Sequence, residues 1–371
     1  MKHAKTPPVQ VTQSALPPLE NYLACVRDIF ASRWLSNQGQ YARRLEQELR
    51  QWLGVPVLAT CANGTLALQL ALRLLGLNGK KVITTPFTYV ATLSALLWEG
   101  CTPVFADIDP QTLCISPEAV ERCLVEHPDA AAILGVHVYG NACDVEALDA
   151  IADRHGLRVL YDAAHAFASR LHGESLFNRG DASVCSFHAT KLFHTVEGGC
   201  IVTGSAEDQR KLALLRAFGH EGDEHVCLGI NAKLSELHAA MGLCLLPQVP
   251  EMIEKRRRLC AAYDAELDME KNPVLRRPLL HPGLEWNFAY YPVVFADAGA
   301  MQAALTALKA ENIHPRRYFY PSLTRLPWFP APPCPVAEDI AGRVLCLPLA
   351  ADMAPALVSR IAGILRSALN S

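Results

Sequence analysis

The stretch AAILGVHV (131–138), DVEALDAIADRHG (144–156) and LRVLYDAAHA (157–166) decides the fold class. An apolar run is followed by a segment with helical periodicity that a glycine closes, and then by a second apolar run. Two apolar runs joined in this way are typical of a βαβ unit, in which both strands are parallel. The stretch therefore predicts an α/β fold whose ligands bind beyond the carboxyl ends of the strands.

The same alternation recurs toward the N-terminus, and it stops near residue 246. The upstream segments that predict strands and helices are VPVLATC (55–61), TLALQLALRLLG (65–76), KVITT (81–85), TPVFADI (102–108) and SPEAVERCLVEH (116–127). From about residue 246 a long polar helix and proline-rich pieces replace the pattern. We therefore predict a large domain over 1–245 and a smaller C-terminal domain over 246–371.

The composition excludes several classes of function. The 371 residues are 51% hydrophobic and 19% charged, with a net charge of -3, so nucleic acid and anionic membranes are not expected partners. The 13 cysteines include no CxxC pair, and the histidines form no HExxH motif, so we expect no metal site and reduced thiols in a cytoplasmic protein. The N-terminal stretch has no apolar signal region, and no apolar run reaches membrane length.

Asp162 follows the apolar run LRVLY (157–161). A carboxylate at the end of a strand that is buried on both faces must find a donor, a cation or a proton. Two explanations stay open from the residues alone. Asp162 either caps the turn that follows it, or it faces a cationic heterocycle in the space that Ala163 and Ala164 leave.

Lys191 lies in SFHATKLFHTVEGG (186–199), just after the apolar run SVCSF (183–187). A lone lysine is usually a solvated surface residue. Here the hydroxyl groups of Ser186 and Thr190 lie nearby in the sequence, and a pair of glycines leads into a further strand. An amine at the edge of a pocket that excludes water can lose its proton and form a Schiff base.

The segment ANGT (62–65) connects a predicted strand to a predicted helix. It is either a simple capped turn or a phosphate site, since Gly64 allows close approach and a helix N-terminus offers free N–H groups. Tyr89, which alone could be a core aromatic, follows another strand. Together with Lys191 and Asp162, these features meet the requirements of pyridoxal 5'-phosphate: an amine for the aldehyde, an acid for the ring nitrogen, a phosphate seat and an aromatic ring face.

Taken in order, the motifs resemble those of the DegT/StrS-type sugar-nucleotide aminotransferases, and the resemblance covers nearly the whole chain. It implies the aspartate aminotransferase fold (pyridoxal-phosphate fold type I), with a mostly parallel central sheet in the large domain and a smaller α+β C-terminal domain. The segments that carry it are SRWLSNQGQYARRLEQEL (32–49), ANGTLALQLALRLLGL (62–77), TTPFTYVAT (84–92), PVFADIDPQT (103–112), HVYGNACDVEAL (137–148), DAAHA (162–166), SFHATK (186–191), EGG (197–199) and GINAKLSELHAAMGL (229–243).

The resemblance implies a role for each candidate residue. Lys191 and Asp162 are the catalytic pair: Lys191 bonds the cofactor's aldehyde, and Asp162 pairs with the pyridine nitrogen. Tyr89 stacks on the ring, and His165 lies near its phenolic oxygen. The other implied cofactor contacts are Gly64, Thr65 and Ser186 at the phosphate, with Asn231 and Lys233 contributed by a partner subunit. A homodimer with shared active sites follows from the last two.

The substrate contacts that we expect are weaker predictions. A sugar nucleotide carries two phosphates, which need cationic or backbone donors. For the arginines concerned, a solvated surface position is an equally good explanation. The candidates are Arg33, Asn37, His188, Arg316 and Tyr320, with Arg317 beside them.

Within the family, the chain is most similar to transaminases that form dTDP-4-amino-4,6-dideoxyglucose. We therefore expect amination of a nucleotide-linked 4-keto-6-deoxyhexose with L-glutamate as donor, in the synthesis of glycan or O-antigen sugars. Amination at C3 and a UDP-linked substrate are the alternatives. Sugar dehydration is disfavoured because members that dehydrate carry histidine where this chain has Lys191. A cofactor-binding regulator ranks last, because family-like sequence starts almost at once.

Overall fold

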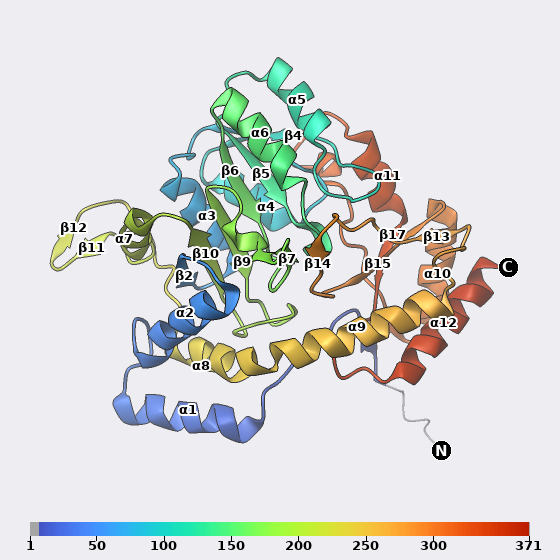
Figure 1. Ribbon diagram of the computed structural model, residues 1–371, viewed down its shortest axis with the longest axis horizontal. Helices are drawn as coiled ribbons and strands as arrows, with labels where there is room; N and C mark the ends of the chain where they lie inside the picture. Colours follow the sequence, from blue (N-terminus) through green and yellow to red (C-terminus); the bar gives the residue numbers. More distant parts are fainter. Residues whose placement is uncertain (1–6, 371) are drawn as a thin grey trace.

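A computed structural model of the protein describes residues 7–370. Residues 1–6 and 371 lie outside the described part, and so do the outermost ends of the two predicted domains. The described chain forms a seven-stranded central sheet with helices on both faces (Figure 1). In spatial order the strands are β2 (Val57–Cys61), β10 (Gly199–Thr203), β9 (Ala182–Ser186), β6 (Arg158–Asp162), β5 (Ala132–Val136), β3 (Lys81–Thr84) and β4 (Thr102–Phe105).

The sheet is mostly parallel, as predicted. Strands β4, β3, β5, β6 and β9 are parallel to one another, and Val136 pairs with Asp162 where β5 and β6 end. Strand β10 is the exception, because it runs antiparallel to both β9 and β2. The segment between β9 and β10 is a loop, so the chain turns back without the crossover helix that a parallel connection needs. Lys191 lies in this loop.

Several helices up to residue 245 begin or end at residues whose side chains or backbone conformation cap them. The side chains of Asn63, Ser116 and Asp144 each accept a backbone N–H at a helix N-terminus, and Gly156 closes one helix in the left-handed region. The α-helices of the described chain up to residue 245 are α1 (Leu19–Ser32), α2 (Gln40–Leu53), α3 (Gly64–Leu74), α4 (Val90–Trp98), α5 (Pro117–Glu126), α6 (Val145–His155), α7 (Ala206–Leu215) and α8 (Glu236–Leu245).

The C-terminal part builds a second apolar cluster around a three-stranded antiparallel sheet. A short turn after Leu245 leads into the long helix α9, which runs along the molecule toward the C-terminal helices (Figure 1). Tyr290 and Phe319 nevertheless pack in the larger core, so the division at 245/246 stays a prediction. The elements are α9 (Val249–Glu266), β13 (Leu275–Arg276), β15 (Tyr291–Phe295), α10 (Ala298–Ala310), α11 (Pro335–Arg343), β17 (Val344–Leu347) and α12 (Pro355–Leu369).

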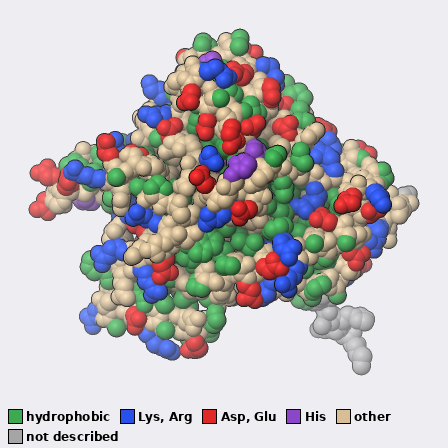
Figure 2. Space-filling model, in the orientation of Figure 1, with side chains coloured by type: hydrophobic (Ala, Val, Ile, Leu, Met, Phe, Trp, Pro, Cys, Tyr) green, Lys and Arg blue, Asp and Glu red, His purple; other side chains and the backbone are tan. Residues whose placement is uncertain are grey.

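Short strand pairs complete the structure. The hairpin of β11 and β12 projects at the left of Figure 1, and Figure 2 shows acidic side chains at its end. Elsewhere on the face in view, charges of both signs are mixed (Figure 2). Within residues 7–370 we find no helix long and apolar enough to cross a membrane. The short strands are β1 (Val9–Gln10) with β16 (Ile313–His314), β11 (His220–Glu221) with β12 (Glu224–His225), and β7 (Arg170–Leu171) with β8 (Glu174–Ser175) and β14 (Leu284–Glu285).

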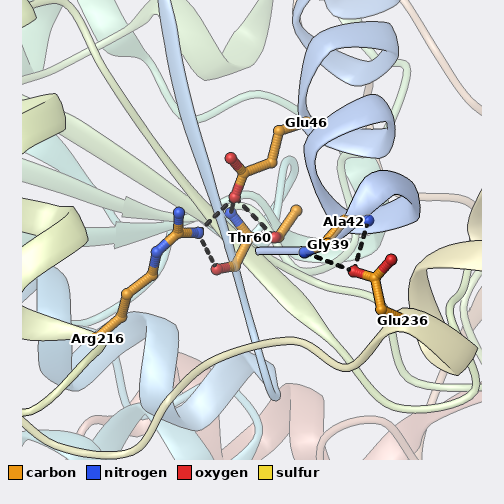
Figure 3. Close-up of polar contacts among 6 residues, drawn as sticks. All are labelled: Gly39, Ala42, Glu46, Thr60, Arg216 and Glu236. Atoms are coloured by element: carbon orange, nitrogen blue, oxygen red, sulfur yellow. Dashed lines mark hydrogen bonds and ion pairs between the residues drawn. The ribbon is translucent and has the colours of Figure 1, made fainter. Parts of the chain in front are cut away.

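A buried carboxylate fixes the start of α2 against α8 (Figure 3). Glu236 accepts the backbone N–H groups of Gly39, Tyr41 and Ala42 at 3.1, 2.8 and 3.1 Å. It thereby satisfies donors that a helix N-terminus otherwise leaves unpaired, because Gly39 has no side chain to cap them. A Cβ atom at position 39 would lie only 2.4 Å from Glu236 Cδ, so the contact also requires glycine there.

A second buried pair lies beside this contact (Figure 3). Arg216 forms an ion pair with Glu46 of α2 and donates to the carbonyl of Thr60 at 2.7 Å. Glu46 in turn accepts the N–H and the hydroxyl of Thr60 at 2.9 and 2.8 Å. The network therefore joins α2, β2 and the end of α7, just beneath the segment that carries Asn231 and Lys233.

Replacing Glu236 with alanine would leave three buried N–H groups without an acceptor. The loss of a helix cap or of a buried hydrogen-bond acceptor costs about 1–3 kcal/mol. We therefore expect E236A to lower the free energy of unfolding by about 3 kcal/mol. Urea unfolding followed by far-UV circular dichroism measures this change. Glu251→Ala is the control, because Glu251 is exposed and pairs only with Lys255 and should cost less than about 0.5 kcal/mol. Equal losses in both variants would contradict the capping role.

Candidate functional site

A cavity of about 250 Å³ opens at the carboxyl ends of β6 and β9, beside the N-terminus of α3. Ligands of parallel α/β sheets bind at this edge, which agrees with the prediction from the sequence. The predicted residues that line the cavity are Gly64, Thr65, Tyr89, Asp162, His165, Ser186, His188, Lys191 and Arg316. The predicted residues that do not line it are Arg33, Asn37, Asn231, Lys233 and Tyr320.

The carboxylate of Asp162 is buried and held by two donors. Its Oδ2 accepts the hydroxyl of Thr92 at 2.8 Å, and its Oδ1 accepts the backbone N–H of Ala164 at 3.1 Å. Burial raises the pKa of Asp162, whereas these hydrogen bonds and the nearby charge of Lys191 lower it. Asp162 therefore caps the following turn and also lines the cavity, whereas its pairing with a cationic heterocycle stays a prediction.

Lys191 is half-buried in the loop between β9 and β10. Its backbone N–H donates to the carbonyl of His188 at 2.9 Å, and Phe187 N–H donates to Gly198 at 2.8 Å, so the loop is pinned at both ends. Within the described residues, Nζ of Lys191 has no hydrogen bond or ion pair. Burial lowers the pKa of Lys191 from the ordinary value of 10.5, with Tyr318 and Asp162 opposing the shift. The site therefore makes this amine easier to deprotonate than that of a lysine in water.

The N-terminus of α3 is a suitable seat for a phosphate. The side chain of Asn63 accepts the N–H of Leu66 at 2.9 Å, whereas the N–H groups of Gly64 and Thr65 have no acceptor within the described residues. A Cβ atom at position 64 would lie 2.8 Å from Cβ of Ser186, so only glycine brings the two segments this close. Unpaired N–H groups, a helix dipole and a hydroxyl meet here, and a dianion needs this set of donors.

His165 and Tyr89 border the cavity from two sides. Nδ1 of His165 accepts the backbone N–H of Tyr139 at 3.2 Å, and burial lowers the pKa of His165 well below its usual range. The ring is therefore neutral and carries its proton on Nε2. Its ring lies 5.5 Å from that of Phe319, nearly parallel to it. Tyr89 precedes α4 and is 55% exposed in the single chain.

Two of the predicted substrate residues, His188 and Arg316, lie at the cavity. Nε2 of His188 is 3.6 Å from the carboxylate of Glu197, and the guanidinium of Arg316 lies 5.1 Å from the ring centre of Tyr318. The others lie outside the cavity. Arg33 ends α1 in the left-handed region, and Tyr320 packs on the guanidinium of Arg317.

Asn231 and Lys233 do not line the cavity of their own chain. Nζ of Lys233 donates to Oδ1 of Asn231 at 2.8 Å and lies 4.7 Å from the ring centre of Phe218. Asn231 is exposed, and the buried anchor of Glu236 follows three residues after Lys233. The segment therefore combines an exposed Asn231 and a half-buried Lys233 with a buried anchor in the single chain.

Two buried histidines that do not line the cavity accept backbone N–H groups. Nδ1 of His137 accepts Cys143 N–H at 3.1 Å, and Nδ1 of His194 accepts Val196 N–H at 3.2 Å. Among residues 7–370, one group could bring three metal-ligand atoms together on the surface: Asp144, Glu146 and His281. All 13 cysteines are free thiols in the described chain.

Several residues at the site were not predicted from the sequence. Thr88, Glu197, Tyr318 and Phe319 line the cavity, and Thr92 bonds Asp162 from behind. Thr88 and Thr92 carry a usable signal, because their i, i+4 spacing places two hydroxyl groups together at the start of a helix. Tyr318 and Phe319 have no such signal, since only the C-terminal part of the fold brings them to the site.

Comparison with known proteins gives matches over nearly the whole chain. The model of the DegT/DnrJ/EryC1/StrS aminotransferase family matches residues 19–366. A dTDP-4-amino-4,6-dideoxy-D-glucose transaminase of Shigella dysenteriae is 38% identical, over 97% of this chain and 98% of that protein. A UDP-N-acetyl-3-dehydro-alpha-D-glucosamine 3-aminotransferase of Acidithiobacillus ferrooxidans is 35% identical, over 92% and 91%. The crystal structure of DesI in the presence of its TDP-sugar product has a TM-score of 0.90 at 36% identity, over 98% of this chain and 94% of that chain.

The lowered pKa of Lys191 predicts an unusual pH dependence of its reactivity. In protein freed of any bound aldehyde, acetic anhydride should modify Lys191 with a half-point below pH 10.5, because a lower pKa leaves more neutral amine at each pH. Mass spectrometry of the labelled peptides follows the reaction, with the exposed Lys80 as reference. Asp162→Asn should move the half-point further down, since the Asp162 charge raises this pKa. A half-point for Lys191 at or above that of Lys80 would contradict the assignment.

Proposed function

Because the chain belongs to the DegT/DnrJ/EryC1/StrS aminotransferase family, we propose that it transfers the amino group of L-glutamate to C4 of dTDP-4-keto-6-deoxyglucose. The products are dTDP-4-amino-4,6-dideoxyglucose and 2-oxoglutarate. The chain is a pyridoxal-phosphate-dependent aminotransferase, and the choice of sugar is the part that we propose. One observation carries this choice: the near full-length match to a transaminase named for that product, at 38% identity.

The residues of the cavity fit pyridoxal phosphate. An amine without a partner and a buried carboxylate line the same cavity, and the start of α3 offers unpaired N–H groups beside Ser186. When bound, the cofactor supplies an electron sink for the bond-breaking step at the amino-bearing carbon. We assign the phosphate to Gly64, Thr65 and Ser186, and the ring face to Tyr89.

Lys191 is the residue that we expect to move protons. With the cofactor bound, the amine of Lys191 would take the proton from Cα of L-glutamate and would give it back later in the same half-reaction. The same amine serves the second half-reaction in the reverse order with the keto sugar. Burial supports this role, because it lowers the pKa of Lys191 and so makes its amine easier to deprotonate than that of an ordinary lysine.

We assign to Asp162 and His165 the contacts that would set the protonation of the cofactor's ring nitrogen and the hydrogen bonding of its phenolic oxygen. An anionic Asp162 would keep a proton on the pyridine nitrogen, and Nε2–H of His165 would donate to the phenolic oxygen. The hydrogen bond from Tyr139 to Nδ1 supports this tautomer. Burial of both side chains keeps water from competing for these bonds.

The assembly that we propose is a homodimer with shared sites. Asn231 and Lys233 would complete the cofactor site of the neighbouring subunit. The exposure of Asn231 in the single chain supports the idea, and so do the exposed apolar side chains of Phe218, Val226 and Leu228 around it. We further propose that His188 and Arg316 contact the substrate within the cavity. Arg33, Asn37 and Tyr320 would contact the substrate outside the cavity.

The cellular role is part of the same proposal. An amino sugar activated as a nucleotide is a building block for surface glycans, including O-antigen. We place the enzyme in the cytoplasm, where its thiols stay reduced, with no nucleic acid or membrane as partner.

Amination at C3 of a UDP-linked sugar is the second candidate. It is favoured by the 35% identity to the 3-aminotransferase of Acidithiobacillus ferrooxidans. Both reactions share the same cofactor chemistry, so the substrate side of the cavity decides between them.

Lys191→Ala tests the catalytic assignment. We expect turnover to fall by more than about 10³-fold and the visible absorbance of the lysine-bound cofactor to disappear, because the variant lacks both nucleophile and base. Circular dichroism should stay unchanged, since Nζ has no partner to lose. Lys80→Ala, at an exposed position, should keep full activity. Wild-type absorbance in K191A would rule out the assignment.

Product analysis decides which carbon is aminated. The enzyme is incubated with L-[15N]glutamate and either dTDP-4-keto-6-deoxyglucose or a UDP-linked 3-keto sugar, and NMR locates the label. We expect label at C4 of the dTDP sugar, with turnover at least about tenfold faster than on the UDP sugar. Label at C3, or a preference for the UDP sugar, would instead support the second candidate.

A further inference from the structure

A chain of two buried hydroxyl groups ends on the carboxylate of Asp162. Oγ1 of Thr88 lies 2.8 Å from Oγ1 of Thr92, and Oγ1 of Thr92 lies 2.8 Å from Oδ2 of Asp162. Thr88, Thr92 and Asp162 are 3%, 0% and 7% exposed, so water does not compete for these bonds. The remaining carboxylate oxygen accepts the N–H of Ala164.

The chemistry of the groups sets the direction of this chain. An ionised carboxylate only accepts, so the hydroxyl of Thr92 donates its single proton to Asp162. Thr92 then has no proton left for Thr88, and the hydroxyl of Thr88 must donate to Thr92. Both hydroxyl groups are therefore oriented toward the carboxylate, and a neutral, protonated Asp162 would break this order.

The position of α4 explains why these residues meet. Thr92 is in the first turn of α4, and its backbone N–H donates to the carbonyl of Tyr89 at 3.1 Å. The positive end of the α4 dipole therefore points toward the same carboxylate. The segment 89–92 thus carries both Tyr89, which lines the cavity, and Thr92, which donates to Asp162.

We propose that Thr92, supported by Thr88, is a positioning residue that fixes the orientation of Asp162 and keeps it anionic inside the protein. The inference rests on the proposed function, in which Asp162 holds the proton on the pyridine nitrogen. Burial alone favours the protonated carboxyl, and the hydroxyl donor counteracts that preference. Without Thr92, Asp162 would become neutral at a higher pH and its carboxylate could rotate.

Thr84 supplies a matched control. Its buried hydroxyl also makes one hydrogen bond of 2.8 Å, but to the carbonyl of Leu134 and not to Asp162. Thr84 is in β3 and does not line the cavity. Thr84→Val and Thr92→Val therefore each remove one buried hydroxyl group, and only the second removes a donor to Asp162.

The test measures cofactor retention and the glutamate half-reaction in the holoenzyme as functions of pH. We expect T92V to bind pyridoxal phosphate about tenfold more weakly and to slow the half-reaction about tenfold, as loss of a hydrogen bond to a charged group does. Because a donor lowers a carboxyl pKa, its removal should move the acid limbs of both profiles to higher pH. Thr92→Ser should restore wild-type behaviour, and T84V should match the wild type in both profiles.

The outcomes separate this inference from the proposed function. If Asp162→Asn impairs both measurements but T92V and T84V have the same profiles, the role of Thr92 is wrong and the function stands. If Asp162→Asn leaves both measurements unchanged, the role of Asp162 falls and the inference falls with it. Should T92V fail to fold, Thr92→Ala decides in its place, because it removes the hydroxyl without placing a methyl group against the carboxylate.

Discussion

The buried carboxylate of Asp162 and the amine of the half-buried Lys191 line one cavity, and the rest of the site depends on this arrangement. Burial disfavours the charged form of each group, raising the pKa of Asp162 and lowering that of Lys191, while each charge stabilises the other. The protein can keep both groups reactive only by supplying donors to the acid and leaving the amine without a partner. Thr92 and Ala164 supply the donors to Asp162. Backbone hydrogen bonds hold the loop that carries Lys191 in place.

The order of strands in the sheet brings Asp162 and Lys191 together. Strands β6 and β9 are parallel neighbours, so the residues that follow them meet at one edge, and α3 brings its N-terminus to the same place. Contacts outside the cavity hold the surfaces around it. Glu236 and Arg216 hold α2 against α8 and β2 through buried charged groups. The segment 231–233 lies between these two residues in the sequence. Rigid support of this kind is what catalytic geometry requires.

The sequence predicted the parts that depend on local pattern and strand order. Lys191, Asp162 and Gly64 follow apolar runs that become strands, and parallel strands bring their ends together. Other parts depend on contacts between distant segments, which no local pattern contains. Thr92 lies 70 residues before Asp162, and Glu236 caps a helix almost 200 residues earlier. Arg33, Asn37, Asn231 and Lys233 were also predicted, but they do not line the cavity of the single chain, so their roles stay predictions.

The central claim is that the amine of Lys191 and the carboxylate of Asp162 hold the two ends of one aldehyde cofactor. A crystal structure of the protein grown with pyridoxal phosphate tests it most directly. The account predicts continuous density from Nζ of Lys191 into the cofactor, the ring nitrogen within hydrogen-bonding distance of Asp162, and the phosphate at the start of α3. Nζ directed into solvent, or a ring nitrogen far from Asp162, would contradict it.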